Sequence, residues 1–281
     1  MKMFKFMQSK LFMVLPIMLT SILSTPTVFS TDWSTTELHY QYGNLRKAYQ
    51  GGGSASETGG TSVLTLQHNS GWKYGDNFFF FDHSNYGKTD VDSLNGDSAG
   101  DEIYGEFYSN FSLGKITGKD IKFGPINDIG LVAGFNFAPE IETLYYMPGV
   151  RLAFDLPGFN FAQLDITGRI QDSSTKQSIK EKDTYMLDFS WAYPFAIDNT
   201  RWSLEGHIEY MHRAKQSIRG VSIDDRKAWW LSQIQLRFDI GHLWGNADKV
   251  FVGIEHQYWR NKQGDPNTTE NVPQLLLVWR L

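Results

Sequence analysis

Apolar and polar residues alternate one by one along most of the chain after residue 30. Between residues 184 and 193, every odd position holds a large apolar or aromatic residue, whereas the even positions include Asp188 and Ser190. The same alternation recurs in three later segments. A period of two predicts β-strands with two unlike faces, and segments with the 3.6-residue period of a helix are nearly absent.

Clusters of Gly, Asn, Asp and Pro divide the chain into twelve predicted strands. These strands are 37–42, 61–69, 76–82, 102–113, 126–138, 143–155, 159–171, 183–193, 201–212, 227–240, 249–261 and 273–281. The connections alternate between long and short, which is typical of outer-membrane barrels with long outer loops and short periplasmic turns. Two connections break this rule: 139–142 is short on the expected outer side, and 114–125 is long on the inner side.

Strand length and charge sorting favour a barrel in a membrane. The four predicted strands between residues 183 and 261 span 11 to 14 residues, whereas soluble strands average about 5–6 and membrane strands need about 9–11. The alternating part of each carries no charge on its apolar face, where a Lys or Arg at the midplane would cost about 2–4 kcal/mol. The alternative is a soluble exported β-sandwich or lipocalin-like barrel with its apolar face inward.

Charge and composition indicate where in the cell the protein is located and which partners it can bind. Residues 1–30 contain Lys2, Lys5 and Lys10, no acid and an apolar stretch, which predicts a signal peptide cut before Thr31 and one barrel domain, 31–281. A retained N-terminal anchor is the alternative. The chain has 26 Lys and Arg against 31 Asp and Glu, and the three lysines lost with the signal leave a net charge of −8, so no basic field for nucleic acid exists. The absence of cysteine excludes disulfides and thiolate metal sites.

No enzyme motif is complete in the sequence. Residues 114–120 read GKITGKD, which lacks the spacing and the final Ser or Thr of a phosphate-binding loop, so we expect a turn there. His83 and Ser84 are adjacent in a predicted loop, whereas a phospholipase-type barrel would need a Ser and a His two apart on one strand face. His207 and Glu209 share a face, but no third metal ligand accompanies them. The sequence predicts no catalytic residue, no metal and no cofactor.

The polar strand face is the candidate functional surface, because it lines the lumen of a membrane barrel. It carries three arginines and nine acids, the acids being Glu102, Glu106, Asp155, Asp165, Asp188, Glu205, Glu209, Asp239 and Glu255. The predicted solute-contacting residues are Glu102, Tyr104, Glu106, Tyr108, Arg151, Asp165, Arg169, Asp188, Glu205, His207, Glu209, Arg237, Asp239, Glu255 and Trp259. An acidic passage with aromatic rings suits neutral or cationic solutes that carry flat rings and hydroxyl groups. The alternative for each residue is that it only fills and rigidifies the barrel.

The stretch 106–125 resembles the nucleoside-specific channel family of the outer membrane, the Tsx type. The resemblance rests on a Glu…Phe-Ser-x-x-Lys-x-Thr-x-x-Asp-x-x-Phe-Gly-Pro run, carried here by Glu106, Phe111, Ser112, Lys115, Thr117, Asp120, Phe123, Gly124 and Pro125. The family forms twelve-stranded barrels, and the motif accounts for the long inner connection. Barrels of this kind usually end in Phe or Trp, whereas this chain ends in Arg280 and Leu281 after Trp279.

The resemblance implies passive uptake of nucleosides and deoxynucleosides across the outer membrane of a Gram-negative bacterium. It also implies contact with outer-membrane lipid and lipopolysaccharide, and a possible role as a receptor for phage or colicin ligands. We therefore expect an all-β, transmembrane antiparallel β-barrel that is a substrate-selective diffusion channel and binds no nucleic acid. The alternatives are a surface receptor or structural barrel with a closed lumen, and a barrel enzyme.

Overall fold

The computed structural model describes residues 31–46, 59–87, 100–139, 142–174 and 178–281. The predicted signal peptide, residues 1–30, lies outside the described residues, as do large parts of the first two predicted outer loops. The first strand begins at Thr31, the residue after the predicted cut. Among the described residues, no helix is long and apolar enough to cross a membrane.

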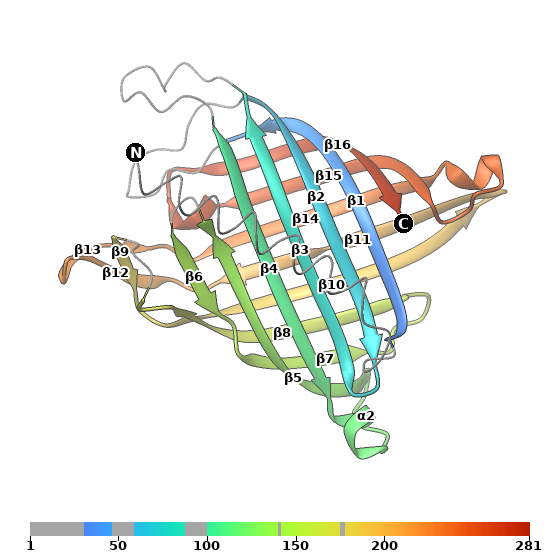
Figure 1. Cartoon of the computed structure of the whole chain (residues 1–281), viewed down its shortest axis with the longest axis horizontal. Helices are drawn as coiled ribbons and strands as arrows, with labels where there is room; N and C mark the ends of the chain where they lie inside the picture. The colour runs from blue at the N-terminus through green and yellow to red at the C-terminus, as the bar shows by residue number, and fades with distance from the viewer. Residues whose placement is uncertain (1–30, 47–58, 88–99, 140–141, 175–177) are drawn as a thin grey trace, which may run out of the picture.

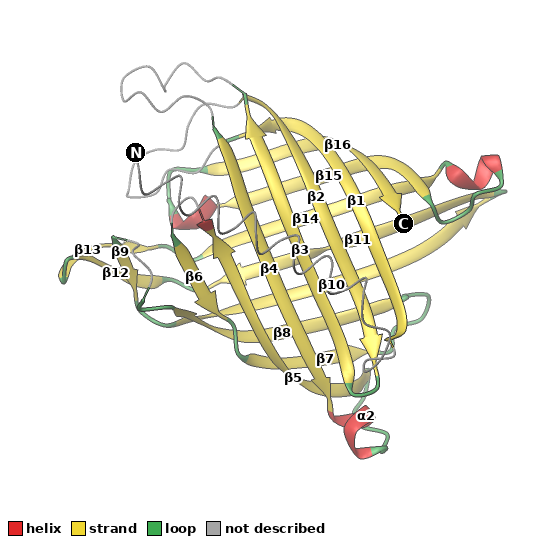
Figure 2. Cartoon of the chain, viewed as in Figure 1, coloured by secondary structure: helices red, strands yellow, loops and turns green. Residues whose placement is uncertain are grey.

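Within the described residues, twelve wall strands pair in chain order and close into an antiparallel barrel (Figure 1). They are β1 (Thr31–Leu45), β2 (Gly59–Trp72), β3 (Gly75–Tyr86), β4 (Asp101–Ser112), β5 (Ile126–Ala138), β6 (Thr143–Tyr146) together with β7 (Gly149–Phe154), β8 (Phe161–Gln171), β10 (Thr184–Ile197), β11 (Thr200–Met211), β14 (Trp229–Asp239), β15 (Val250–Arg260) and β16 (Thr269–Arg280). Figure 2 shows how little of the described chain lies outside strands. The predicted fold class and strand number are confirmed.

The first and last strands pair with each other, which removes both open edges of the sheet. Glu37 on β1 is the register partner of Arg280 on β16, and the amide of Leu281 donates to the carbonyl of Thr36 at 2.9 Å. Both ends of the described chain therefore lie at one end of the barrel. We call this the inner end, because short turns connect the strands there, and the opposite end, with the longer loops, the outer end.

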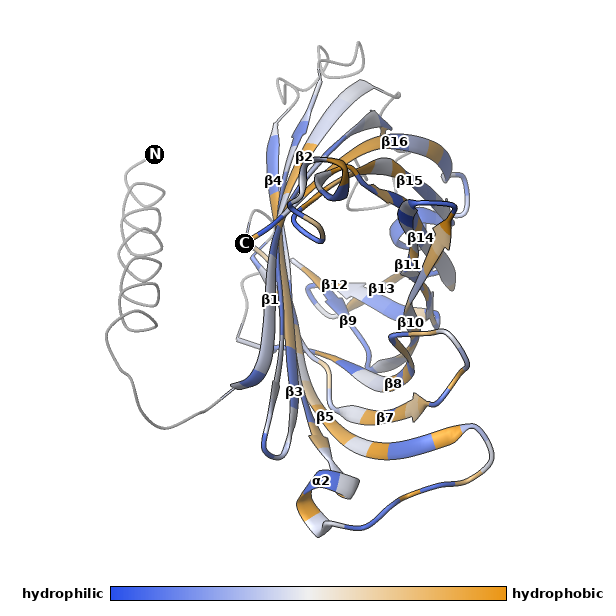
Figure 3. Ribbon diagram, turned by 90° about the vertical axis from the view of Figure 1, so that its right-hand side faces the viewer, coloured by the Kyte–Doolittle hydropathy of each residue, from blue (hydrophilic) through white to orange (hydrophobic). Residues whose placement is uncertain are grey.

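The outward and inward faces of the strands separate sharply. Figure 3 shows apolar and polar residues alternating along the strands. One row across four neighbouring strands is apolar and exposed on the outside: Leu204, Leu236, Ile254 and Leu275. The row beside it points into the barrel: Glu205, Gln235, Glu255 and Gln274. The strand positions that the sequence predicted to face lipid are the positions that face outward in the structure.

Some predicted boundaries were wrong. The first three strands were predicted too short, since β1 extends from Thr31 to Leu45 and β2 and β3 are also longer than expected. The predicted strand 143–155 is interrupted at Pro148, which has no amide hydrogen to donate. Pairing continues on both sides of the break, because Met147 exchanges two backbone hydrogen bonds with Gly134, at 2.7 and 3.2 Å.

The long inner connection contains a short helix, α2 (Leu113–Thr117), where the sequence predicted only a turn. The Ser112 hydroxyl caps it by accepting from the amide of Lys115 at 3.0 Å. The Lys115 ammonium donates to the carbonyl of Gly75 at 2.9 Å and so ties the helix to the neighbouring hairpin turn. These motif residues therefore serve to hold the inner connection against the barrel.

The outer end carries a second, three-stranded sheet that the sequence predicted as loops. It consists of β9 (Ile179–Glu181), β12 (Ala214–Ile218) and β13 (Val221–Arg226), which extend beyond the barrel wall in Figure 1. The pair Glu181 and Gln216 has the same register as the pairs of β10 with β11. The outer sheet is thus a continuation of that barrel hairpin, with β13 added at its edge.

Glu181 anchors this outer sheet to the barrel. Its carboxylate accepts from Arg169 on β8, from Arg226 Nη1 at 3.0 Å and from Gln216 Nε2 at 2.9 Å, and the Tyr145 hydroxyl donates to it at 3.2 Å. Burial alone would raise the pKa of the Glu181 carboxyl. The guanidinium groups of Arg226 and Arg169 nevertheless hold that pKa well below its usual range.

The strand parity predicts which engineered cysteines meet lipid. Cysteine should react with a lipid-phase label, and not with a membrane-impermeant reagent, at Leu187, Phe189, Leu204, Ile208, Leu236 and Ile254. Cysteine at Gln235, adjacent to Leu236 in β14, is the matched inward control and should not react with the lipid-phase label. Labelling with the opposite parity would reject the register, because a one-residue slip inverts every face.

The Glu181 anchor predicts a pH dependence of the outer sheet. Because the pKa of Glu181 is lower in the folded than in the unfolded chain, its stabilisation is complete above the ordinary carboxyl pKa of about 4.3 and is lost as the pH falls through the folded value. At neutral pH, Glu181→Gln should speed amide hydrogen exchange in β9 and β12 by at least about tenfold, since two buried cations lose their partner. Exposed Asp183→Asn is the control, and equal exchange in both variants would contradict the anchor.

Candidate functional site

All fifteen predicted solute-contacting residues lie on wall strands and on their inward faces. A sixteenth candidate, Asp155, was predicted as a lumen acid, and this was wrong. β7 ends at Phe154, so Asp155 is exposed in the turn at the inner end, where its amide donates to the carbonyl of Pro125 at 2.9 Å. The alternation simply stops one residue earlier than the sequence suggested.

A cavity of about 550 Å³ occupies the outer part of the lumen. Eight of the predicted residues line it: Glu102, Tyr104, Glu106, Arg169, His207, Glu209, Glu255 and Trp259. The other seven lie deeper or closer to the inner end: Tyr108, Arg151, Asp165, Asp188, Glu205, Arg237 and Asp239. The structure therefore divides the predicted set into an outer cavity and an inner layer.

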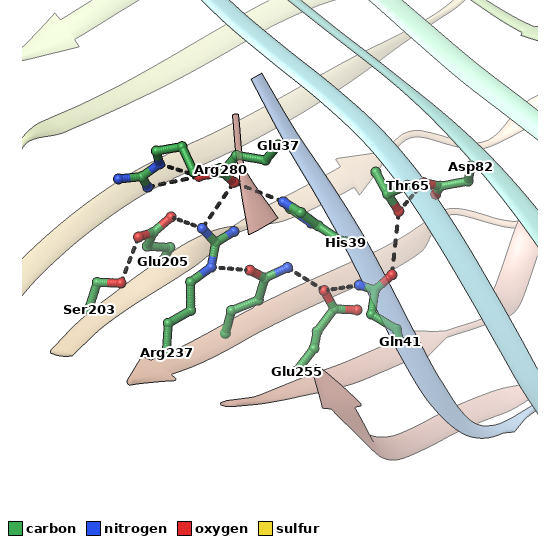
Figure 4. A network of polar contacts seen from close by, with 11 residues as sticks. Glu37, His39, Gln41, Thr65, Asp82, Ser203, Glu205, Arg237, Glu255 and Arg280 are labelled. Carbon is green, nitrogen blue, oxygen red and sulfur yellow. Dashed lines mark hydrogen bonds and ion pairs between the residues drawn. The ribbon is translucent and has the colours of Figure 1, made fainter. Parts of the chain in front are cut away.

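A network of polar side chains connects the inner layer to the cavity wall, from Glu205 on β11 to Asp82 on β3 (Figure 4). Nη1 of Arg237 lies 3.1 Å from a carboxylate oxygen of Glu37 and 3.1 Å from one of Glu205. Glu37 also accepts from Arg280 Nε at 2.8 Å and contacts His39 Nε2 at 2.8 Å. The side chains of Arg237 and Glu37 are 3% and 4% exposed, so each charge is stable there only because it is paired.

Arg151 forms a second bridge, on the wall made by β3 to β8. Its Nε and Nη2 donate to the two oxygens of Asp165 at 2.6 and 2.7 Å, and its Nη1 donates to Asp76 at 2.6 Å. To reach β3, the side chain passes its register partner Gly130 on β5. A Cβ at Gly130 would fall 1.9 Å from the Asn110 side chain, so a larger residue there would displace that side chain from its hydrogen bond with Asp76.

Among the described residues, no cation contacts the carboxylate of Glu255. It is 2% exposed and accepts four side-chain amide hydrogen bonds: from Gln41 at 2.7 Å, Gln233 at 3.3 Å, Gln235 at 2.6 Å and Gln274 at 2.9 Å. Only the ionised carboxylate accepts on all of its sites. Within the described residues Glu255 forms no ion pair, so neutral amides hold a full charge in the cavity wall.

Glu106 and Glu209 line the cavity from β4 and β11, which lie on facing walls. Glu106 accepts from the Tyr104 hydroxyl at 2.5 Å and from Asn136 Nδ2 at 2.8 Å. Glu209 is 7% exposed, and in the described part of the chain its carboxylate has neither a hydrogen bond nor an ion pair. Its acceptor sites are open toward the cavity.

His207 lies in the same wall, between an acid and an amide. Its Nε2 is 2.8 Å from Gln233 Oε1, and its Nδ1 is 3.3 Å from Asp188 Oδ1. Both ring nitrogens thus face oxygen atoms. The predicted pair of His207 with Glu209 does not extend to a metal site, because no described group of three His, Cys, Asp or Glu residues could hold a metal ion.

Two tryptophans give the cavity an aromatic wall. The rings of Trp229 and Trp259 lie 5.3 Å apart at an interplanar angle of 52°, and both side chains line the cavity. Neither indole N–H has a hydrogen-bond partner among the described residues. On another wall, Phe80 and Tyr104 pair at 5.9 Å. The cavity therefore has an aromatic wall beside the open acceptor sites of Glu209, while the two indole N–H atoms are themselves buried.

Sequence reasoning missed several charged residues of the lumen and its mouth: Glu37, Asp76, Asp82, Glu181, Arg226, Lys262, Glu270 and Arg280. Asp76 and Asp82 bracket the run Phe78–Phe81, in which four consecutive phenylalanines hide the alternation. In the structure Phe78 pairs with Phe80 and Phe79 with Phe81, as the two faces of a strand require. Because alternate residues of a strand share a face, counting back from Asp82 in steps of two would have placed Asp76 on the same inward face.

The enzyme-like pair His83 and Ser84 lies in β3, not in a loop as predicted. Adjacent residues of a strand point to opposite faces. Ser84 lines the cavity, and His83 lies 3.6 Å from Asp101. These two residues therefore do not form a nucleophile and its base.

Solved structures with a similar arrangement are outer-membrane barrels. An outer membrane channel from Pseudomonas putida F1 aligns with a TM-score of 0.50 at 10% identity, over 92% of this chain and 97% of that one. The NanC porin aligns with a TM-score of 0.48 at 13% identity, over 87% of this chain and all of the porin. At these identities the likeness concerns the fold alone.

Sequence comparison identifies the family. No curated protein matched the sequence. Residues 35–274, which span the barrel from β1 to β16, match the family described as nucleoside-specific channel-forming protein, Tsx. The match extends far beyond the motif at 106–125. The chain therefore belongs to the Tsx family of nucleoside-specific channel-forming proteins.

Proposed function

We propose that nucleosides diffuse passively through this barrel and that the outer cavity is where they are recognised. Family membership and the closed barrel support a channel of the outer membrane. The observation that carries the recognition site is the composition of the cavity. It combines aromatic side chains with carboxylates that have no cationic partner among the described residues.

Each part of a nucleoside has a chemical counterpart in the cavity. The base can stack on the aromatic wall that Trp229 and Trp259 form. Sugar hydroxyls can donate to Glu209, whose acceptor sites are open, or compete for Glu106. Each of these contacts is weak and replaceable by water, which permits both selection and rapid release. Neither a cofactor nor an energy source is required.

The inner layer supplies a second selective step. Arg237 and Arg151 each contact two carboxylates, so this layer offers hydrogen-bonding groups with little positive charge. A receptor or structural barrel with a closed lumen remains the second candidate, because the same network crosses the inner half of the passage. Conductance of single molecules in planar bilayers separates the two functions.

The cavity charge predicts exclusion of nucleotides. A nucleoside is neutral at pH 7, whereas a monophosphate carries roughly −1.5 to −2, by analogy with phosphorylated side chains. One carboxylate about 8 Å away opposes each such charge by roughly 1 kcal/mol at an effective dielectric of 40. Flux of adenosine should exceed that of its monophosphate by at least about tenfold in low salt, and the ratio should fall as salt screens the field.

Liposome swelling with adenosine, thymidine and their monophosphates measures this ratio. The variant Glu255→Gln should lower it, because a negative charge leaves the cavity wall. An exposed acid at the inner end provides a matched control, Asp198→Asn, which should leave the ratio unchanged. Equal flux of nucleoside and monophosphate through the wild-type protein would show that the passage is not electronegative.

The aromatic wall predicts a difference between two neighbouring tryptophans. Trp229 points into the cavity, whereas Trp230 is 47% exposed on the outer face. Since stacking of a base on an aromatic ring contributes about 1–3 kcal/mol, Trp229→Leu should raise the half-saturating nucleoside concentration by about fivefold or more. Trp230→Leu, the control, should leave it unchanged. Identical values for both variants, measured as nucleoside block of ion current, would remove Trp229 from the site.

A further inference from the structure

Basic residues gather at the outer end, on the side of the outer sheet that faces away from the cavity. The cavity is lined by Glu181 from β9 and Gln216 from β12. Their neighbours Lys182 and Lys215 are exposed and do not line it, as the alternation of side chains along a strand requires. Arg213, two positions before Lys215, is also exposed and also absent from the cavity wall.

These cations lie close together without acidic partners. The pair Glu181 and Gln216 sets the register, which places Lys182 opposite Lys215, and the amide of Lys182 donates to the carbonyl of Lys215 at 2.9 Å. Like charges directly opposite each other in a sheet are destabilising. Within the residues that the structure describes, neither lysine forms an ion pair, nor does Arg213. The fold therefore maintains a concentration of positive charge that it does not itself neutralise.

Aromatic side chains on the outside of the barrel mark the level of this cluster. Tyr185 is 42% exposed and Trp230 47% exposed, Tyr210 packs against Trp230 at 4.8 Å, and Tyr185 stacks on His212 at 4.6 Å. Outward Tyr and Trp residues near strand ends form the girdle at a membrane interface. Because Arg213 directly follows His212, the cations lie just beyond that girdle.

One further cation joins them from the barrel wall. Arg260, the last residue of β15, is exposed on the outward face and is the register partner of Trp230. At the level of the aromatic girdle, an outward arginine lies at the edge of the hydrocarbon layer. Its long side chain can extend from there into the polar headgroup layer. It thus adds to the same band of positive charge around the outer rim.

We propose that Lys182, Arg213 and Lys215, with Arg260, form a binding site for the phosphate groups of lipopolysaccharide in the outer leaflet. The outer end of the barrel stands in that leaflet, whose headgroups are phosphorylated sugars. A guanidinium binds a phosphate through two parallel hydrogen bonds, and ammonium groups add point charges. The site shares no residue with the cavity and serves to hold the rim of the channel in its lipid.

Binding of fluorescent lipopolysaccharide to the purified full-length barrel in mild detergent, without divalent cations, tests the site. The triple variant Lys182→Gln, Arg213→Gln and Lys215→Gln should weaken binding by at least about tenfold. The matched control removes three exposed lysines at the inner end, Lys73→Gln, Lys119→Gln and Lys122→Gln, and should change binding less than about twofold. Lipopolysaccharide stripped of phosphate should bind the wild-type protein as weakly as intact lipopolysaccharide binds the outer triple variant.

Three results would overturn the proposal. They are equal loss of binding in both triple variants, undiminished binding of the phosphate-stripped lipid, and equally strong competition by phosphatidylglycerol, which would mean that any anionic lipid suffices. Nucleoside flux through the outer triple variant should equal that of the wild type and shows that the barrel is folded. Because the substituted residues do not line the cavity, failure of this site would leave the channel proposal standing.

Discussion

Contact with lipid on one face of every strand is the constraint on which the rest of this structure depends. It forces apolar residues outward, and because side chains alternate, it collects the polar residues in a narrow lumen. Charges gathered there lose water and must find partners. Arg237 and Arg151 meet this need by reaching across neighbouring strands to Glu37 and Asp76, past Gly253 and Gly130 in the register.

The same constraint explains how much the sequence could reveal. Alternation is local, so strand number, parity and the polar lumen could be predicted from it. It fails where local contrast is missing, as at Phe78–Phe81, where neighbouring positions are identical on both faces. Alternation also cannot predict ion pairs between residues that only the tertiary structure brings together. Glu181 lies in a predicted loop, and only the folded outer sheet places it against Arg169 and Arg226.

The number of charged residues in the sequence does not show how positive and negative charges are distributed along the lumen. The inner layer is locally balanced, because acids such as Glu37, which alternation had not assigned to the lumen, meet Arg237 and Arg280. The outer cavity is different, since Glu255 is held by glutamine amides and Glu209 has no partner among the described residues. Glutamines carry no charge, so the distribution of charged residues between the two strand faces does not reveal them. The structure therefore distinguishes acids of the inner layer that contact arginines from acids of the cavity that no cation contacts.

This distribution suits a channel better than a tight binding protein. A cation beside Glu255 would neutralise the charge that excludes phosphate, whereas the glutamine amides satisfy this carboxylate and leave its charge in place. A neutral solute can exchange hydrogen bonds with such groups at little net cost, since water does the same. The solute is then bound weakly enough to leave, and the inner layer of paired charges meets it next. Selectivity would arise from the sequence of two polar environments, and not from strong affinity at either one.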